Sequence, residues 1–133
     1  MFRGLFSKRK PPLTGAPAVR RMKTYSAQSG YVYQYFYEGQ REFRSRSEHG
    51  AEFVFQISAD RKNWTRASIL VAFSALETWQ DSHGRELSST ERYAIAKMAL
   101  FQAFDERRSP AEMLPEIRVR AADVEAIVDS LGL

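Results

Sequence analysis

Cysteine is absent from this chain of 133 residues, and histidine occurs only twice. The lack of cysteine excludes disulfide bonds, thiolate nucleophiles and zinc or iron–sulfur centres held by cysteine. It fits a reducing cytoplasm, where disulfides rarely persist, and we therefore expect a cytoplasmic protein. A chain of this length is expected to form one domain, and its hydrophobic fraction of 44% is ordinary for a globular protein with its own core.

Long hydrophobic runs are also missing. The longest uncharged apolar run covers residues 67–76, and it is far shorter than the ~20 residues that a transmembrane helix needs. The first residues contain no apolar stretch of the length found in secretory signals, which is roughly 7–15 residues. We therefore expect no transmembrane segment and no signal peptide.

Motifs that carry chemistry are scarce. His49 and His83 each precede a glycine in an expected turn, and neither has the neighbours of a catalytic or metal-binding histidine. The sequence contains neither an HExxH motif nor a glycine-rich phosphate loop. Asp105 and Glu106 are adjacent, so their carboxylates point apart on a helix. We expect no catalytic residue, no metal and no cofactor, and we favour a non-enzymatic protein while leaving an enzyme open.

Positive charge is concentrated in the first half of the chain. Residues 1–66 contain 13 Lys/Arg against 5 Asp/Glu, whereas residues 67–133 contain 7 against 11. Residues 1–22 hold six basic residues, three prolines and no acidic residue. Such a segment has too little apolar surface to offset the entropy of ordering, so we expect a basic disordered tail. The alternative is that the basic half presents a surface for a polyanion.

Alternation with a period of two predicts strands after this tail. Residues 30–38 alternate between tyrosine and other side chains, and residues 51–58 place Phe53, Phe55 and Ile57 on one face. Residues 64–73 are rich in β-branched and apolar side chains, which favour strands. Residues 41–47 form either a polar strand or a loop. Turns are expected at residues 38–40, 49–50 and 60–63, where glycine or Asp and Asn occur.

Helical patterns begin at residue 74. Ser74 and Glu77 have the spacing of a capping box, and Gly84 suits the left-handed end of that helix. Ser88 and Glu91 have the same spacing at the start of the clearest helix, residues 88–108, whose apolar arc predicts that much of its surface is covered. A short turn over residues 109–115 is expected next, with a third capping signal. A strand or extended arm over residues 116–120 and a helix over residues 121–131 complete the chain.

Strands followed by helices predict an α+β fold. The connections between the strands are short, so the expected topology is an antiparallel β-meander of three to four strands over residues 23–73. The helices, over residues 74–131, are expected to pack on one sheet face, with the longest helix on Phe53, Phe55 and Ile57. The prediction is thus a single α+β domain over residues 23–133, preceded by the tail of residues 1–22.

The candidate binding residues are tyrosines and arginines of the expected sheet. An exposed tyrosine stripe needs a cover, so we expect a non-enzymatic interaction domain that binds a second copy of the chain or another protein. The alternative is a nucleic-acid-binding module, in which tyrosines stack on unpaired bases and basic side chains contact phosphates. A tyrosine stripe is also compatible with simple packing between strands. The candidate residues are Tyr31, Tyr33, Tyr35, Tyr37, Arg41, Arg44 and Arg46.

Overall fold

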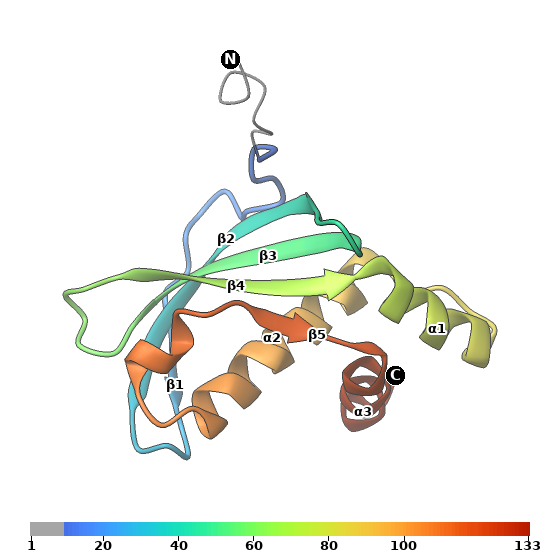
Figure 1. Ribbon diagram of the computed structural model, residues 1–133. Coiled ribbons are helices and arrows are strands. Elements are labelled where there is room, and N and C mark those ends of the chain that lie inside the picture. The colour runs from blue at the N-terminus through green and yellow to red at the C-terminus, as the bar shows by residue number, and fades with distance from the viewer. Residues whose placement is uncertain (1–9) are drawn as a thin grey trace.

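The computed structural model describes residues 10–133 of the chain. Four strands come first in the described part of the chain, and three helices with one short strand follow (Figure 1). In chain order the elements are β1 (Lys23–Ser26), β2 (Val32–Arg44), β3 (His49–Ser58), β4 (Thr65–Ala72), α1 (Phe73–His83), α2 (Ser89–Glu106), the 3-10 helix η2 (Pro110–Met113), β5 (Ile117–Val119) and α3 (Ala121–Leu131).

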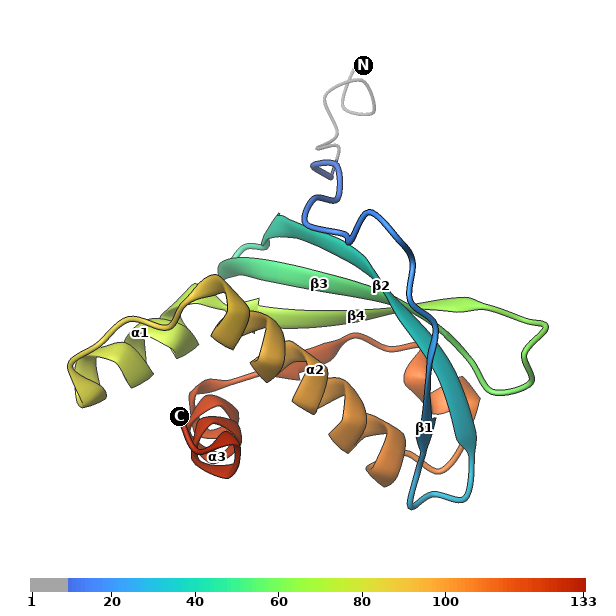
Figure 2. The ribbon, with the colours of Figure 1, turned by 180° about the vertical axis from the view of Figure 1, so that it is seen from behind.

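One sheet contains all five strands in the order β1-β2-β3-β4-β5. The strands β1 to β4 form an antiparallel meander, whereas β5 pairs with β4 in parallel. The helices α1, α2 and α3 lie on one side of this sheet (Figures 1 and 2). The predicted α+β fold and its meander are confirmed, and the strand or arm expected at residues 116–120 is a fifth strand. Its parallel pairing is possible because α1 and α2 form the crossover from β4.

The strand β2 is longer than expected because Gly39 continues it instead of ending it. The register moves from Tyr37 opposite Phe55 to Gly39 opposite Val54, which is a β-bulge. Gly39 has a φ of 134°, which glycine adopts without strain, and β2 continues through it, so the turn predicted at residues 38–40 is wrong. Residues 41–44 are therefore strand. The turn predicted at residues 49–50 is also wrong, since β3 begins at His49 and the hairpin turns before it.

The capping box of α2 is confirmed, whereas the one proposed at Ser74 is wrong. The Ser88 hydroxyl accepts a hydrogen bond from the Glu91 backbone N–H at 3.1 Å, and the Glu91 carboxylate accepts one from the Ser88 N–H at 2.9 Å. The helix α1 starts at Phe73, directly after β4, and its N-cap makes no side-chain hydrogen bond. Because strand and helix follow without a loop, Ser74 is already helical. Gly84 adopts the expected left-handed conformation at the end of α1.

The last part of the chain follows the predicted order of elements. The short turn is η2, although the Ser109 side chain makes no capping hydrogen bond. The helix α3 spans the predicted residues, ends at a left-handed Gly132 and contacts α1. Its buried side chains are Val124, Ile127 and Val128. The amphipathic pattern was therefore sufficient to locate this helix.

The core lies between the sheet and the three helices, and α2 covers its aromatic part. Phe53, Phe55 and Ile57 are buried on the face that the sequence assigned to the longest helix, so that prediction is confirmed. From α2, Leu100 and Phe104 are completely buried against this face. Stacked or edge-on aromatic pairs add about 0.5–1.5 kcal/mol each beyond the burial of their area. A dense aromatic layer thus joins α2 to β1, β2 and β3.

A segment before β1, residues 10–22, runs along the edge of β2 that β3 leaves open (Figure 2). We call it the N-terminal segment. Thr14 forms an antiparallel bridge with Gln40 through two backbone hydrogen bonds of 2.8 Å. The Arg20 guanidinium lies 4.2 Å from the centre of the Phe36 ring. Of the predicted tail, residues 1–9 lie outside the described residues, and contacts with the sheet begin before residue 23.

Candidate ligand-binding cavity

The candidate tyrosines face α2. Tyr33 is 0% exposed and Tyr35 is 5% exposed, so neither offers a surface to a macromolecular partner. The Tyr33 ring stacks on Phe104 with 4.1 Å between centroids. Tyr37 is half-buried, and Tyr31 is 38% exposed near the start of β2. The expectation of an open tyrosine face therefore does not hold for Tyr33 and Tyr35, because α2 covers the side of the sheet to which they point.

The candidate arginines lie apart from the tyrosines. Arg41 pairs with Glu52 on the sheet face opposite to α2, and its side chain is only 9% exposed. Arg44 is exposed at the end of β2, and Arg46 is exposed in the turn that follows. The bulge at Gly39 shifts the alternation by one residue, so residues beyond it face the side that the pattern of residues 31–37 does not predict. The structure does not bring the two groups together.

Arg41 belongs to a buried polar group on that opposite face. Its Nε donates a hydrogen bond of 2.8 Å to the Glu52 carboxylate, which also accepts one of 2.7 Å from the Ser68 hydroxyl. Burial would raise the pKa of Glu52, but the hydrogen bonds from Arg41 and Ser68 outweigh it and lower the pKa. Glu52 therefore remains ionised at neutral pH, and both of its carboxylate oxygens accept hydrogen bonds, as is typical of a structural ion pair.

A cavity of about 470 Å³ lies between the N-terminal segment, β2 and the first turn of α2. The N-terminal segment pairs with β2 at Thr14 and again from Lys23, which is opposite Tyr35. Between these two pairings it leaves the edge of β2, and the cavity occupies this interval. We call it the edge cavity. Its lining residues are Gly15, Pro17, Arg21, Lys23, Tyr35, Phe36, Tyr37, Gln40, Ser89, Thr90 and Tyr93.

Aromatic side chains form the inner wall of the edge cavity. The rings of Tyr37 and Tyr93 meet edge to face, with 4.8 Å between their centroids. Burial, and then the proximity of Tyr93, raises the pKa of Tyr37 to about 12. Burial also raises the pKa of Tyr93. Both hydroxyls are therefore protonated at neutral pH, when they can donate or accept hydrogen bonds.

Basic and hydroxyl groups form the outer rim of the edge cavity. Arg21 and Lys23 come from the N-terminal segment and β1, and Ser89 and Thr90 come from the start of α2. Among residues 10–133, no aspartate or glutamate lines the cavity. The rim is therefore positive and rich in hydrogen-bond donors, while the wall is aromatic.

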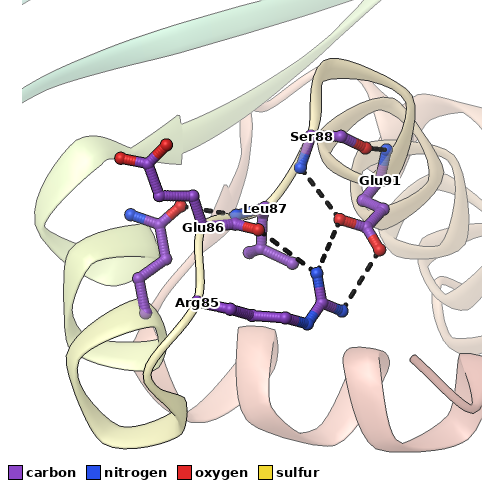
Figure 3. A network of polar contacts seen from close by, with 6 residues as sticks. Arg85, Glu86, Leu87, Ser88 and Glu91 are labelled. Carbon is purple, nitrogen blue, oxygen red and sulfur yellow. Dashed lines mark hydrogen bonds and ion pairs between the residues drawn. The ribbon is translucent and has the colours of Figure 1, made fainter.

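The loop between α1 and α2 holds the rim residues of α2 in place (Figure 3). Arg85 donates hydrogen bonds of 3.1 and 3.2 Å to the Glu91 carboxylate, and the Leu87 backbone N–H donates one of 2.7 Å to Gln80. Hydrogen bonds from Arg85 and Ser88 lower the pKa of Glu91 to about 2. The Glu91 carboxylate is thus turned toward this loop. These contacts set the position of the first turn of α2.

Other kinds of site find little support in the described part of the chain. Within residues 10–133, no cluster of His, Asp and Glu could hold a metal ion, and no helix is long and apolar enough to cross a membrane. His83 stacks on Trp79 and contacts the Glu125 carboxylate at 2.9 Å, which joins α1 to α3. His49 packs edge-on against Phe73. Each histidine thus has a structural partner.

No known protein family, curated protein or solved structure matches this chain. Inference about its function therefore depends on the geometry of the edge cavity.

Sequence reasoning found part of this cavity. It singled out Tyr35 and Tyr37 but missed Tyr93 and the hydroxyls of Ser89 and Thr90. Tyr93 did carry a signal, since a tyrosine within the wide apolar arc of a helix brings a hydroxyl into the core. The position of Lys23 at the cavity could not be predicted, because the path of the N-terminal segment along β2 cannot be read from its composition.

Proposed function

We propose that the protein is a binding domain for a small aromatic molecule, which it takes up in the edge cavity. The observation that carries this proposal is a cavity of about 470 Å³ with an aromatic wall and a polar rim. Pockets for small ligands have volumes of about 300–1,000 Å³, apolar walls and a few placed polar groups. The edge cavity has all three properties.

The contacts of the wall indicate how such a molecule is held. Tyr37 and Tyr93 line the cavity with aromatic rings and protonated hydroxyls, so a planar ring gains both packing and a hydrogen bond there. Between Thr14 and Lys23 the edge of β2 has no strand pairing with the N-terminal segment. Its backbone groups can therefore serve a ligand with hydrogen-bonding atoms.

This proposal keeps the idea of a binding domain and changes the partner. A surface centred on Tyr33, Tyr35 and Tyr37 would require these rings to be accessible, whereas Tyr33 and Tyr35 are buried and Tyr37 is half-buried. Tyr35 and Tyr37 instead contribute to a concave site. A concave site of this size suits a small molecule better than a flat macromolecular surface.

The test is a titration of the full chain with small aromatic compounds, monitored by NMR chemical shifts of backbone amides. We expect shifts concentrated at residues 15–23, 35–40 and 89–93. Thr90→Trp should fill the cavity and abolish the shifts, because Thr90 lines it and is exposed. Thr78→Trp, at an exposed threonine of α1 that does not line it, is the matched control.

Two results would count against the proposal. One is the absence of shifts at millimolar concentrations of every compound. The other is equal binding by the Thr90→Trp and Thr78→Trp variants, which would place the compounds elsewhere on the protein.

A further inference from the structure

Two basic side chains, Arg21 and Lys23, line the edge cavity. A third, Lys97, lies one helical turn after Tyr93 and close to Lys23. The ion pairs found among residues 10–133 involve other arginines and His83, and none includes Arg21, Lys23 or Lys97. A concentration of positive charge with no carboxylate partner in this part of the chain is an electrostatic match for an anion.

Opposing effects act on the charge of Lys97. Its ammonium lies 5.7 Å from the centre of the Phe101 ring, a cation–π contact that favours the charge, whereas the half-buried position of the side chain disfavours it. Burial, and then the charge and close contact of Lys23, lowers the pKa of Lys97. Two ammonium groups so close together repel each other unless an anion lies between or beside them. The Glu91 carboxylate, on the first turn of α2, is bound by Arg85 and the Ser88 N–H.

We propose that the edge cavity binds a planar aromatic compound that carries a phosphate group, with the phosphate at Lys23, Lys97 and Arg21 and the ring against Tyr37 and Tyr93. This inference rests on the proposed function and specifies its ligand. A phosphate monoester carries close to two negative charges at neutral pH, which balances the two ammonium groups. Arg21 adds a planar donor group, and the hydroxyls of Ser89 and Thr90 lie on the same rim.

The experiment compares three probes by isothermal titration calorimetry with the full chain: phenyl phosphate, phenol and inorganic phosphate. Phenyl phosphate should bind most tightly, because only it uses both the rim and the wall. Lys23→Met and Lys97→Met should each weaken its binding about tenfold, which is the effect of losing one hydrogen bond to a charged group. Lys62→Met, at an exposed lysine in the turn between β3 and β4, should leave binding unchanged.

Thermal unfolding of the same variants separates loss of the site from loss of the fold. Lys97→Met removes the repulsion with Lys23, so its melting temperature should equal or exceed that of the wild type while binding falls. A variant that binds less and also melts earlier would indicate a structural role for Lys97 and would overturn the assignment of the phosphate to it.

The remaining outcomes distinguish this inference from the proposed function. If phenol binds as tightly as phenyl phosphate and the lysine variants bind like the wild type, the proposed phosphate contact is wrong. The proposed binding of an aromatic molecule would still stand. If inorganic phosphate binds as tightly as phenyl phosphate, the aromatic ring makes no contribution and both proposals are wrong. If none of the three probes binds, both proposals also fail.

Discussion

The two faces of this sheet are stabilised in different ways. The face toward α2 is aromatic and apolar, with Tyr33 stacked on Phe104 and Phe55 completely buried. The opposite face buries a charged pair, Arg41 and Glu52, joined at 2.8 Å. The first face thus depends mainly on the area removed from water, whereas the second combines the burial of Phe36, Val54 and Leu70 with the hydrogen-bond geometry of one ion pair.

The difference in stabilisation goes together with a difference in cover. An 18-residue helix lies over the aromatic face. On the other side, Lys10 and Pro11 of the N-terminal segment line a cavity of about 430 Å³ with Glu52 and Leu70. The helix covers its face with many side chains, so a single substitution there changes stability through the packing volume that it removes. The N-terminal segment is attached by few hydrogen bonds, so the stability of the opposite face should be sensitive to the loss of one partner of the Arg41–Glu52 ion pair.

The largest effect is expected on the aromatic face. Phe104→Ala should lower the free energy of unfolding by about 3–5 kcal/mol, because it removes a completely buried ring and leaves a cavity. Phe43→Ala, a half-buried ring beyond the bulge, should cost roughly 1 kcal/mol. Urea unfolding of both variants measures the contrast. Equal losses in the free energy of unfolding would mean that the two faces are stabilised in the same way.

Breaking the ion pair on the opposite face should have a slightly smaller effect. Arg41→Met leaves Glu52 buried without its partner and should cost about 3 kcal/mol. Replacing both residues, as in Arg41→Met with Glu52→Leu, should restore most of this loss, since no buried charge remains. Chemical denaturation of both single variants and the double variant gives the coupling energy. A double variant as unstable as Arg41→Met would contradict the assigned role.

The attachment of the N-terminal segment can be tested through a pair of glycines with positive φ. A Cβ at Gly39 would lie 2.7 Å from the Thr14 carbonyl oxygen, whereas one at Gly30 would meet nothing within 4 Å. Gly39→Ala should therefore cost about 1–3 kcal/mol and weaken binding in the edge cavity, while Gly30→Ala should show only the backbone strain. Calorimetric unfolding and phenyl phosphate binding are the measurements. Unaltered binding by Gly39→Ala would separate the cavity from this contact.

The smallest difference between the two faces is expected in the pH dependence of stability. It is absent at neutral pH and is measurable only at strongly alkaline or acidic pH. Burial, and then a hydrogen bond to Asp105, raises the pKa of Tyr25 to about 12, and burial does the same for Tyr37. Their contribution to stability is complete below pH 10 and is lost as the pH rises toward 12. Tyr25→Phe should reduce this alkaline loss in thermal unfolding. An unchanged alkaline profile would exclude Tyr25 as a source.

The opposite face should respond at the other end of the pH scale. Glu52 has a pKa below its ordinary value of 4.5, so its contribution is present above that pH and is lost as the pH falls through the lowered value. Glu52→Gln should flatten the acidic side of the stability profile and leave the alkaline side as it is. A change on the alkaline side alone would contradict this division between the two faces.

Much of the fold could be predicted because its signals are local. Ser88 and Glu91 predicted the start of α2, since a capping box involves only four consecutive residues. The alternation of Phe53, Phe55 and Ile57 predicted the core face of β3, because side chains on a strand must alternate. Gly39 misled the prediction, since positive φ is common to turns and bulges. The choice between them depends on whether β3 continues to pair beyond it.

The candidate site was less predictable. The sequence indicated Tyr35 and Tyr37 as binding residues, but it could not show that α2 covers Tyr35 or that the N-terminal segment closes one side of a cavity. It also grouped Arg41 with the tyrosines, although the bulge places it on the opposite face. Each of these depends on contacts between residues far apart in the chain.

The sequence by itself determined the order of elements, the core face of β3 and the capped start of α2, because hydrogen bonds and side-chain periods act over a few residues. Only the tertiary structure decided that β2 continues through Gly39, that Lys97 lies close to Lys23, and that a cavity remains between the N-terminal segment, β2 and the start of α2. The physical reason is the same in each case. Pairing and packing of distant segments select one of several conformations that are locally almost equal in energy.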